Sequence, residues 1–270
     1  EPQSATKQAL LALKKLQNKL DVLERMRTEP IAVVGMACRF PGGAHDPDAF
    51  WELLTEGRDA ISEISEERWK VEDYFDPTPG TPGKVYTKWG GFLEGIDRFD
   101  PDFFGISRSD AAHMDPQQRL LLEVAWEALE SAGQVVDRLA GSKTGVFVGI
   151  MNNDYSRLLS RDAAKIGIYT GLGSSMSVAS GRISYLFDFQ GPCVTLDTAC
   201  SSSLVSVHLA VQSLRNGECH LALAGGSNAL LTPDAFIATC AMNMLAPDGR
   251  CKTFDARGDG YVRGEGCGIV

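Results

Sequence analysis

One cysteine in this sequence stands where a nucleophile is expected. Cys200 follows an apolar run at 194–198 and precedes three serines and an amphipathic stretch at 201–215. This order predicts a strand, a tight turn and a helix, with Cys200 at the start of the helix. The unpaired N–H groups and the dipole of a helix start favour a thiolate and stabilise the oxyanion formed when a thioester is attacked. Cys200 is therefore a candidate nucleophile, and a structural thiol is the alternative.

The remaining cysteines show no pattern of metal ligands. They stand at positions 38, 193, 219, 240, 251 and 267. No C-x-x-C occurs, and no cysteine–histidine cluster has the spacing of a zinc site, so we expect no metal. Most of these cysteines are expected to be buried free thiols. The sequence also contains no complete dinucleotide loop, no G-x-S-x-G elbow and no phosphate-binding loop.

The elements that must position Cys200 alternate between buried strands and helices. Apolar runs predict strands at 31–35, 145–149, 194–198 and 220–224. Amphipathic stretches predict helices at 50–54, 116–132, 176–185 and 201–215, and prolines and glycines predict a long loop at 76–91. This alternation is typical of an α/β layered domain. Residues 266–270 resemble the opening of a further core strand, so we expect the chain to be cut short.

Residues 1–28 differ from the rest of the chain in pattern and in charge. Leu13 and Leu20 lie on one seam and Leu16 and Leu23 on the other, a spacing of three and four residues that ends before Pro30. The segment holds six basic and three acidic residues, whereas the whole chain has a net charge of −9. We expect a parallel dimeric coiled coil that binds a partner. The alternatives are a helix packed on its own domain and a solvated helix face.

Composition excludes two classes of partner. A net charge of −9 argues against nucleic acid, which requires a basic face. No apolar run approaches the roughly 20 residues that span a bilayer, and no secretory leader is recognisable. We therefore expect a cytoplasmic protein that binds neither nucleic acid nor membrane.

Four blocks of the sequence resemble the ketosynthase domains of modular type I polyketide synthases. They are residues 29–43, 114–130, 197–204, and 247–252 together with 261–266, and the likeness runs from 29 to 270. The resemblance implies an α/β fold of the thiolase-like layered-sandwich type. This chain would supply its N-terminal half and the start of a further strand. It also divides the chain into a docking coiled-coil helix at 1–28 and a ketosynthase domain at 29–270.

The same resemblance implies the activity of a β-ketoacyl synthase, which is an acyltransferase. Cys200 would accept an acyl chain from an acyl carrier protein, whose phosphopantetheine arm presents the substrate. The acyl-enzyme would then undergo decarboxylative Claisen condensation with a malonyl-type extender on a carrier protein. The domain itself would bind no cofactor. Thr170, Met176 and Phe236 would shape the acyl pocket or a dimer channel, and Leu13, Leu16, Leu20 and Leu23 would form the docking coil.

The partners implied by the resemblance are a second copy of the chain, an acyl carrier protein, an adjacent acyltransferase domain and the C-terminal tail of an upstream synthase polypeptide. None of the four histidines matches the family's two catalytic histidine blocks, which the resemblance places beyond Val270. His208 is expected to be a packed helix residue, and Thr239-Cys240 departs from the family pattern near the acyl pocket. Two alternatives remain open: a fatty-acid-synthase-type condensing enzyme, and a non-elongating ketosynthase that acts as an interaction module.

Overall fold

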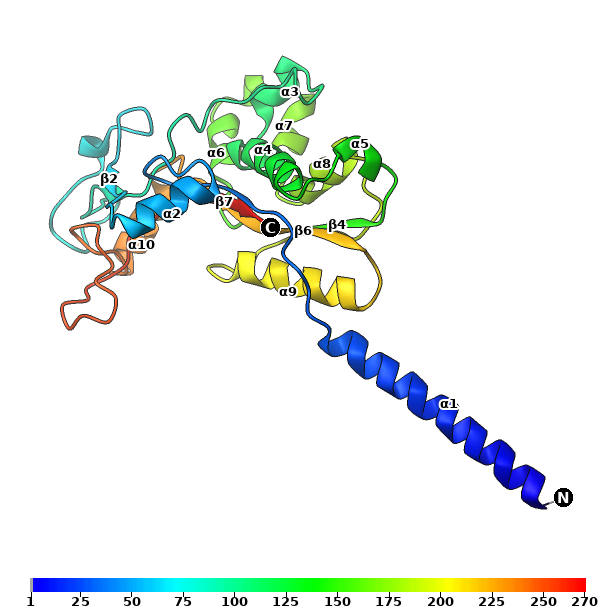
Figure 1. Ribbon diagram of the computed structural model, residues 1–270. Coiled ribbons are helices and arrows are strands. Elements are labelled where there is room, and N and C mark those ends of the chain that lie inside the picture. Colours follow the sequence, from blue (N-terminus) through cyan, green and yellow to red (C-terminus); the bar gives the residue numbers. More distant parts are fainter. Residues whose placement is uncertain (1) are drawn as a thin grey trace.

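The computed structural model describes residues 2–270, and its centre is a mixed five-stranded sheet (Figure 1). The strand order is β1-β7-β6-β4-β5. The bounds are β1 Ala37–Arg39, β4 Thr144–Gly149, β5 Cys193–Leu196, β6 Leu221–Asn228 and β7 Gly266–Ile269. Strand β4 runs parallel to β5 and β6, whereas β7 is antiparallel to β6 and β1. Two short strands, β2 Ser62–Glu63 and β3 Trp89–Gly90, form a separate antiparallel pair.

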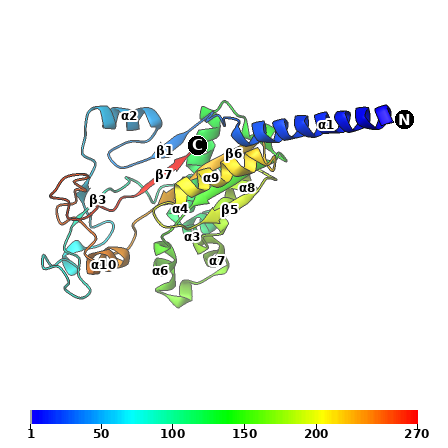
Figure 2. The same ribbon diagram turned by 90° about the horizontal axis from the view of Figure 1, so that it is seen from below.

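Helices cover both faces of the large sheet. Helices α4 and α8 lie on one face and α9 on the other, and Figure 2 shows α9 in front of the sheet when the molecule is seen from below. The α-helices are α1 Pro2–Thr28, α2 Pro47–Thr55, α3 Arg108–His113, α4 Pro116–Ser131, α5 Val136–Leu139, α6 Asp154–Ser160, α7 Ile168–Ser174, α8 Val178–Leu186, α9 Ser202–Arg215 and α10 Asp234–Ala241. Two 3₁₀-helices span Val71–Asp73 and Ala163–Lys165. The predicted α/β layered arrangement is confirmed.

The central strand β4 explains how the layers are held together. All six of its residues are buried. Val146 and Val148 belong to the main core with α4 and α8, whereas Phe147 packs with Ala210 and Ala224 on the side of α9. A strand buried on both faces needs apolar residues throughout, because neither face meets water. This is why the run at 145–149 is almost continuously apolar.

Helix α4 begins and ends at the residues that the sequence indicates. The side chain of Asp115 accepts the backbone N–H of Gln117 at 2.9 Å, and Pro116 occupies the first helical position. The helix ends at Ser131, and Gly133 has a left-handed φ of 65°. The other predicted helices correspond to α2, α8 and α9, and three predicted strands correspond to β4, β5 and β6.

The strand predicted at 31–35 is wrong. Residues 31–36 have no regular structure, and Val33 and Val34 are more than half exposed. The edge strand β1 begins only at Ala37, which pairs with Ile269 of β7. No strand lies opposite residues 31–36 in the part of the chain that the structure describes, so their apolar side chains have no sheet to join.

Helix α1 extends away from the rest of the molecule (Figure 1). Leu13, Leu16 and Leu20 are each between 52% and 64% exposed, so they do not pack on the body of the chain. The side chain of Leu23 lies outside the described residues. Across residues 2–270, no helix combines the length and the apolar character that a membrane span requires.

Candidate active site

Cys200 lies in the turn between β5 and α9 and is exposed. The residue before it, Ala199, has a left-handed φ of 55°. This conformation is unfavourable for a residue with a Cβ atom, and such strain persists only where the surrounding structure fixes it. The turn therefore holds Cys200 in a position that an unsupported chain would not adopt.

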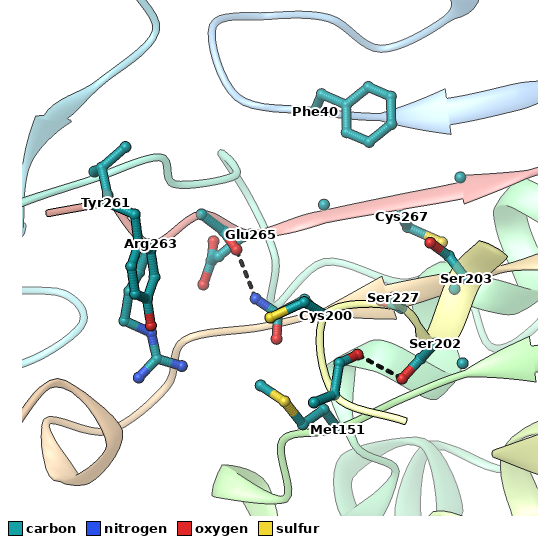
Figure 3. Close-up of a pocket in the computed structure, with 18 residues that line it drawn as sticks. Phe40, Met151, Cys200, Ser202, Ser203, Ser227, Tyr261, Arg263, Glu265 and Cys267 are labelled. Atoms are coloured by element: carbon teal, nitrogen blue, oxygen red, sulfur yellow. Dashed lines mark hydrogen bonds between the residues drawn. The ribbon is translucent and has the colours of Figure 1, made fainter. Parts of the chain in front are cut away.

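Hydrogen bonds from the first turn of α9 fix this conformation. The hydroxyl of Ser202 donates to the carbonyl oxygen of Ala199 at 2.6 Å, as Figure 3 shows, and accepts the N–H of Thr198 at 2.9 Å. The hydroxyl of Ser201 donates to the carbonyl oxygen of Thr198 at 2.8 Å. Asp197 accepts the N–H of Ala199 at 2.8 Å. The serines around Cys200 thus brace the turn that presents the thiol.

Two glycines let the start of α9 rest directly on the sheet. A Cβ atom on Gly149, at the end of β4, would lie 2.6 Å from the Cβ atom of Ser202. A Cβ atom on Gly226 would lie 3.3 Å from the Cβ atom of Ser203 in α9 and 2.7 Å from the carbonyl oxygen of Gly149. Any larger residue at these positions would push α9 outward. The close contact sets the distance between Cys200 and the ends of β4 and β6.

Cys200 opens onto a cavity of about 480 Å³. Its wall comes from the turn before α9, from the ends of β4 and β6, and from residues 261–268, which lead into β7 (Figure 3). Met151 and Tyr261 are among the lining side chains, and Phe40 contributes from the residue after β1. The cavity is large enough to receive an organic group attached to the sulfur.

Glu265 anchors the wall formed by residues 261–268. Its side chain is fully buried; the carboxylate accepts the N–H of Leu93 at 2.7 Å and that of Leu230 at 2.9 Å, and pairs with Arg68 at 2.8 Å. Burial raises the pKa of this carboxyl, and the Arg68 charge and the backbone N–H groups oppose the rise. Glu265 therefore ties three separate segments of the chain to the cavity wall.

A second set of hydrogen bonds reaches the same wall from helix α4. The Asn228 side chain donates to the carbonyl oxygen of Gly264 at 2.6 Å and accepts from Asn152 at 2.7 Å (Figure 3 draws the first of these bonds). The carbonyl oxygen of Asn152 accepts from Gln117 at 2.8 Å, and Gln117 contacts Asp115. The cavity wall is thus connected to the buried start of α4.

The acyl-pocket residues expected from the sequence do not line this cavity. Thr170 is buried in α7, where its hydroxyl accepts the N–H of Gly167 at 3.0 Å. Met176 packs against the main core. Phe236 is fully buried in α10, with its ring centre 5.5 Å from that of Trp69.

The described histidines also lie away from the cavity. None of the four lines it. His208 is exposed on α9, so the expectation that it is a packed helix residue is wrong. No group of three or more metal-ligating side chains occurs within residues 2–270.

Three cysteines are exposed, and Cys200 is the one among them that lines the cavity. Cys193 and Cys251 are the other two. The remaining four are buried, as expected for most of the cysteines. Burial raises the pKa of Cys38 and Cys240, and it raises that of Cys267 to about 12.

Several cavity residues were not predicted as site residues. Met151, Asn228 and Arg263 line the wall, together with Glu265. The block at 261–266 resembles a family motif, and this likeness could have identified Arg263 and Glu265. Met151 and Asn228 follow no motif, because their place depends on where β4 and β6 end.

The family model and the curated relatives that match this chain indicate the same family. The family model described as β-ketoacyl synthase, N-terminal domain, matches residues 28–270. A phenolphthiocerol/phthiocerol polyketide synthase polypeptide of Mycobacterium tuberculosis is 51% identical over 256 residues, which are 94% of this chain and 17% of that protein. Phthioceranic/hydroxyphthioceranic acid synthase of Mycobacterium bovis is 49% identical over 249 residues, which are 92% of this chain and 12% of that protein.

Solved structures agree with this result. An oxazolomycin ketosynthase domain from Streptomyces albus superposes with a TM-score of 0.82 at 44% identity, covering 88% of this chain and 42% of that one. The ketosynthase from module 6 of the bacillaene synthase of Bacillus subtilis gives 0.78 at 42% identity, covering 88% and 39%. The chain thus spans less than half of each of these relatives. It belongs to the β-ketoacyl synthase family, with the ketosynthase fold and with polyketide synthases as its relatives.

Proposed function

We propose that this chain is the N-terminal part of a polyketide-synthase ketosynthase and that Cys200 accepts the acyl chain. The observation that carries the proposal is the position of Cys200, which is exposed at a strained, braced turn and opens onto a cavity of about 480 Å³. Family membership supports the type of reaction. The small share of each relative that the chain covers supports its being part of a longer enzyme.

The first half-reaction is acyl transfer. The sulfur of Cys200 attacks the carbonyl carbon of an acyl thioester on the phosphopantetheine arm of an acyl carrier protein. The new sulfur–carbon bond forms as the bond to the carrier sulfur breaks, and the carrier thiol leaves with a proton. In this proposal the backbone N–H of Cys200, next to the start of α9, stabilises the oxyanion of the tetrahedral intermediate.

The second half-reaction forms the carbon–carbon bond. A malonyl-type thioester on a carrier protein loses CO₂, and the resulting carbanion attacks the acyl carbonyl carbon on Cys200. The sulfur–carbon bond breaks and the thiolate is restored. No histidine lines the cavity within the described residues, so we assign the histidines that the family uses in this step to a part of the enzyme outside this chain.

We also propose that α1 is a docking element of a homodimeric enzyme. Leu13, Leu16 and Leu20 are exposed on this helix, and exposed leucines at a spacing of three and four residues favour pairing with another helix. The basic excess of residues 1–28 suits a mostly acidic tail from an upstream synthase polypeptide. An adjacent acyltransferase domain would load the carrier protein.

Replacement of Cys200 tests the proposal in the complete ketosynthase polypeptide that contains this chain. Cys200→Ala should abolish β-ketoacyl product, with a loss on the order of 10³-fold or more, because the acyl-enzyme cannot form. The matched control is Cys251→Ala, which removes an exposed thiol outside the cavity and should leave the product rate unchanged. Product formation by the Cys200→Ala enzyme at the original rate would contradict the proposal. Acyl loading of Cys200 without any product would instead favour a non-elongating role.

A further inference from the structure

Arg263 is a buried cation in the wall of the cavity that Cys200 lines. The residue is 7% exposed, and its Nη1 has no hydrogen-bond partner within residues 2–270. No carboxylate lies within ion-pair distance of it in that part of the chain. An unpaired charge is costly to bury, and burial accordingly lowers the pKa of this guanidinium. A buried cation of this kind is stabilised by an anion, which a ligand in the cavity can supply.

The neighbouring carboxylates are already engaged. Glu265, two residues along the same segment, pairs with Arg68 and accepts two backbone N–H groups. Asp154, after Tyr261, opposes the lowering of the Arg263 pKa by burial. However, its Oδ2 accepts the N–H groups of residues 231 and 232 at 3.0 and 3.2 Å. Within residues 2–270, neither acid forms an ion pair with Arg263.

Phe236 holds the guanidinium without occupying its N–H groups. The guanidinium carbon lies 5.1 Å from the centre of the Phe236 ring, which is fully buried. A contact with the face of a ring orients the planar cation and leaves its edges available for hydrogen bonds. Figure 3 shows Arg263 beside Tyr261 in the wall, in the same cavity as Cys200.

We propose that Arg263 binds an anionic group of the thioester substrate in this cavity. The inference rests on the proposed function, whose substrates carry two such groups: the carboxylate of the malonyl-type unit and the phosphate of the phosphopantetheine arm. Both present two oxygens that match the paired N–H groups of a guanidinium. The carboxylate belongs to the same small unit as the thioester that must reach Cys200, whereas the phosphate stands at the far end of the arm.

The kinetic consequence follows from the chemistry of decarboxylation. The contact is made with the carboxylate before it departs as CO₂, so it stabilises the bound substrate more than the transition state. Loss of the contact should therefore raise KM for the malonyl substrate without lowering kcat. Damage to the fold of the wall would lower kcat instead.

The test compares Arg263→Met and Arg263→Lys in the complete ketosynthase polypeptide, with two malonyl donors. One donor is a malonyl carrier protein, and the other is malonyl N-acetylcysteamine thioester, which has no phosphate. We expect Arg263→Met to raise KM for both donors by about 10- to 100-fold, as for a lost hydrogen bond to a charged group. Arg263→Lys should recover part of the loss, and acylation of Cys200 by a simple acyl thioester should not change.

The other outcomes are also decisive. A rise in KM confined to carrier-borne substrates, and shared by acyl loading, would identify the phosphate as the bound anion. Unchanged KM values for every donor would overturn the proposal and leave Arg263 a structural cation. If Cys200 were not acylated even in the unsubstituted enzyme, the proposed function would fail independently of Arg263.

A binding measurement on the complete ketosynthase polypeptide avoids dependence on turnover. Malonate, inorganic phosphate and neutral malonamide are each tested for their ability to slow the alkylation of Cys200 by iodoacetamide. We expect malonate to slow it and malonamide not to, with protection lost in Arg263→Met and retained in part in Arg263→Lys. Equal protection of the unsubstituted and Arg263→Met chains by malonate would contradict an anion site at this residue.

Discussion

The hydroxyl of Ser202 and the carbonyl oxygen of Ala199 form a hydrogen bond of 2.6 Å across the turn that carries Cys200. The same hydroxyl accepts the N–H of Thr198 at 2.9 Å, so a single side chain fixes the backbone ahead of the cysteine at two points. The left-handed φ of 55° at Ala199 depends on this support. The position of the proposed nucleophile is therefore set by a residue in the first turn of the following helix.

Ser202→Ala should release this turn. We expect the free energy of unfolding to fall by about 0.5–1.5 kcal/mol, because the partly buried N–H of Thr198 and carbonyl oxygen of Ala199 lose their partner. Acylation of Cys200 should slow by about an order of magnitude as the sulfur becomes less well positioned. Ser160→Ala is the control, because its exposed hydroxyl donates to the carbonyl oxygen of Ser156 within α6. Equal acylation rates in the two variants would show that the turn does not need Ser202.

Gly149→Ala should displace the start of α9. Its Cβ atom would lie 2.6 Å from the Cβ atom of Ser202 and 2.7 Å from the Ser202 carbonyl carbon, which is too close for any contact. We expect a loss of about 1–3 kcal/mol in unfolding free energy, measured by chemical denaturation. The matched variant is Gly171→Ala in α7, where an added Cβ meets nothing within 4 Å. It should be neutral or slightly stabilising, and a similar loss in both variants would contradict the packing argument.

Asp115 should make stability depend on pH. Burial raises the pKa of its carboxyl to about 6, whereas an unfolded aspartate titrates near 4. The folded state thus holds the proton more tightly, and the stability gained at low pH is lost as the pH rises through about 6. Linkage gives a loss of about 1.4 kcal/mol from Asp115 between pH 5 and pH 7.5.

Asp115→Asn isolates this effect. Asparagine keeps an oxygen that can accept the N–H of Gln117 but does not titrate. Urea denaturation measures the unfolding free energy at pH 5 and at pH 7.5. The change between the two pH values should be smaller in the variant by about 1.4 kcal/mol. The raised pKa values of Glu123 and Glu265 affect both proteins equally and cancel in the comparison. An identical pH dependence of the two proteins would rule out Asp115 as its source.

The seam of α1 provides a test of docking. Leu16→Asp with Leu20→Asp places two charges where a coiled coil would bury leucines, at a cost of several kcal/mol. We expect acyl transfer from an upstream carrier protein to be lost, and transfer in the unsubstituted protein to weaken with salt. Leu11→Asp with Asn18→Asp adds the same charge off the seam and should leave transfer intact. If the two double variants behave alike, α1 is not paired through this seam.

The sequence predicted the elements around Cys200 well because their patterns are local. The start of α4 follows from Asp115 and Pro116, and the central strand follows from the apolar run at 145–149. The strand predicted at 31–35 failed because an apolar run forms a strand only if another strand lies beside it. That condition depends on the register of β1 and β7, which no local pattern contains.

In the candidate site, too, the sequence predicted the features that depend on local patterns and missed those that depend on distant contacts. Cys200 could be identified from its place before an amphipathic helix, but the left-handed backbone at Ala199 could not, because no glycine marks it. Arg263 lines the cavity because β7 runs between β6 and β1, and within residues 2–270 it forms no ion pair with the acids near it. Both facts depend on contacts between segments that are far apart in the sequence.

Identification of the acylated residue tests the central claim most directly. The complete ketosynthase polypeptide is incubated with an acyl thioester, digested, and its cysteine peptides are analysed by mass spectrometry. We predict an acyl adduct on Cys200 and none on Cys193 or Cys251, which are exposed but lie outside the cavity. An adduct on either of those two residues with Cys200 unmodified would contradict the assignment of Cys200 as the acyl-accepting nucleophile.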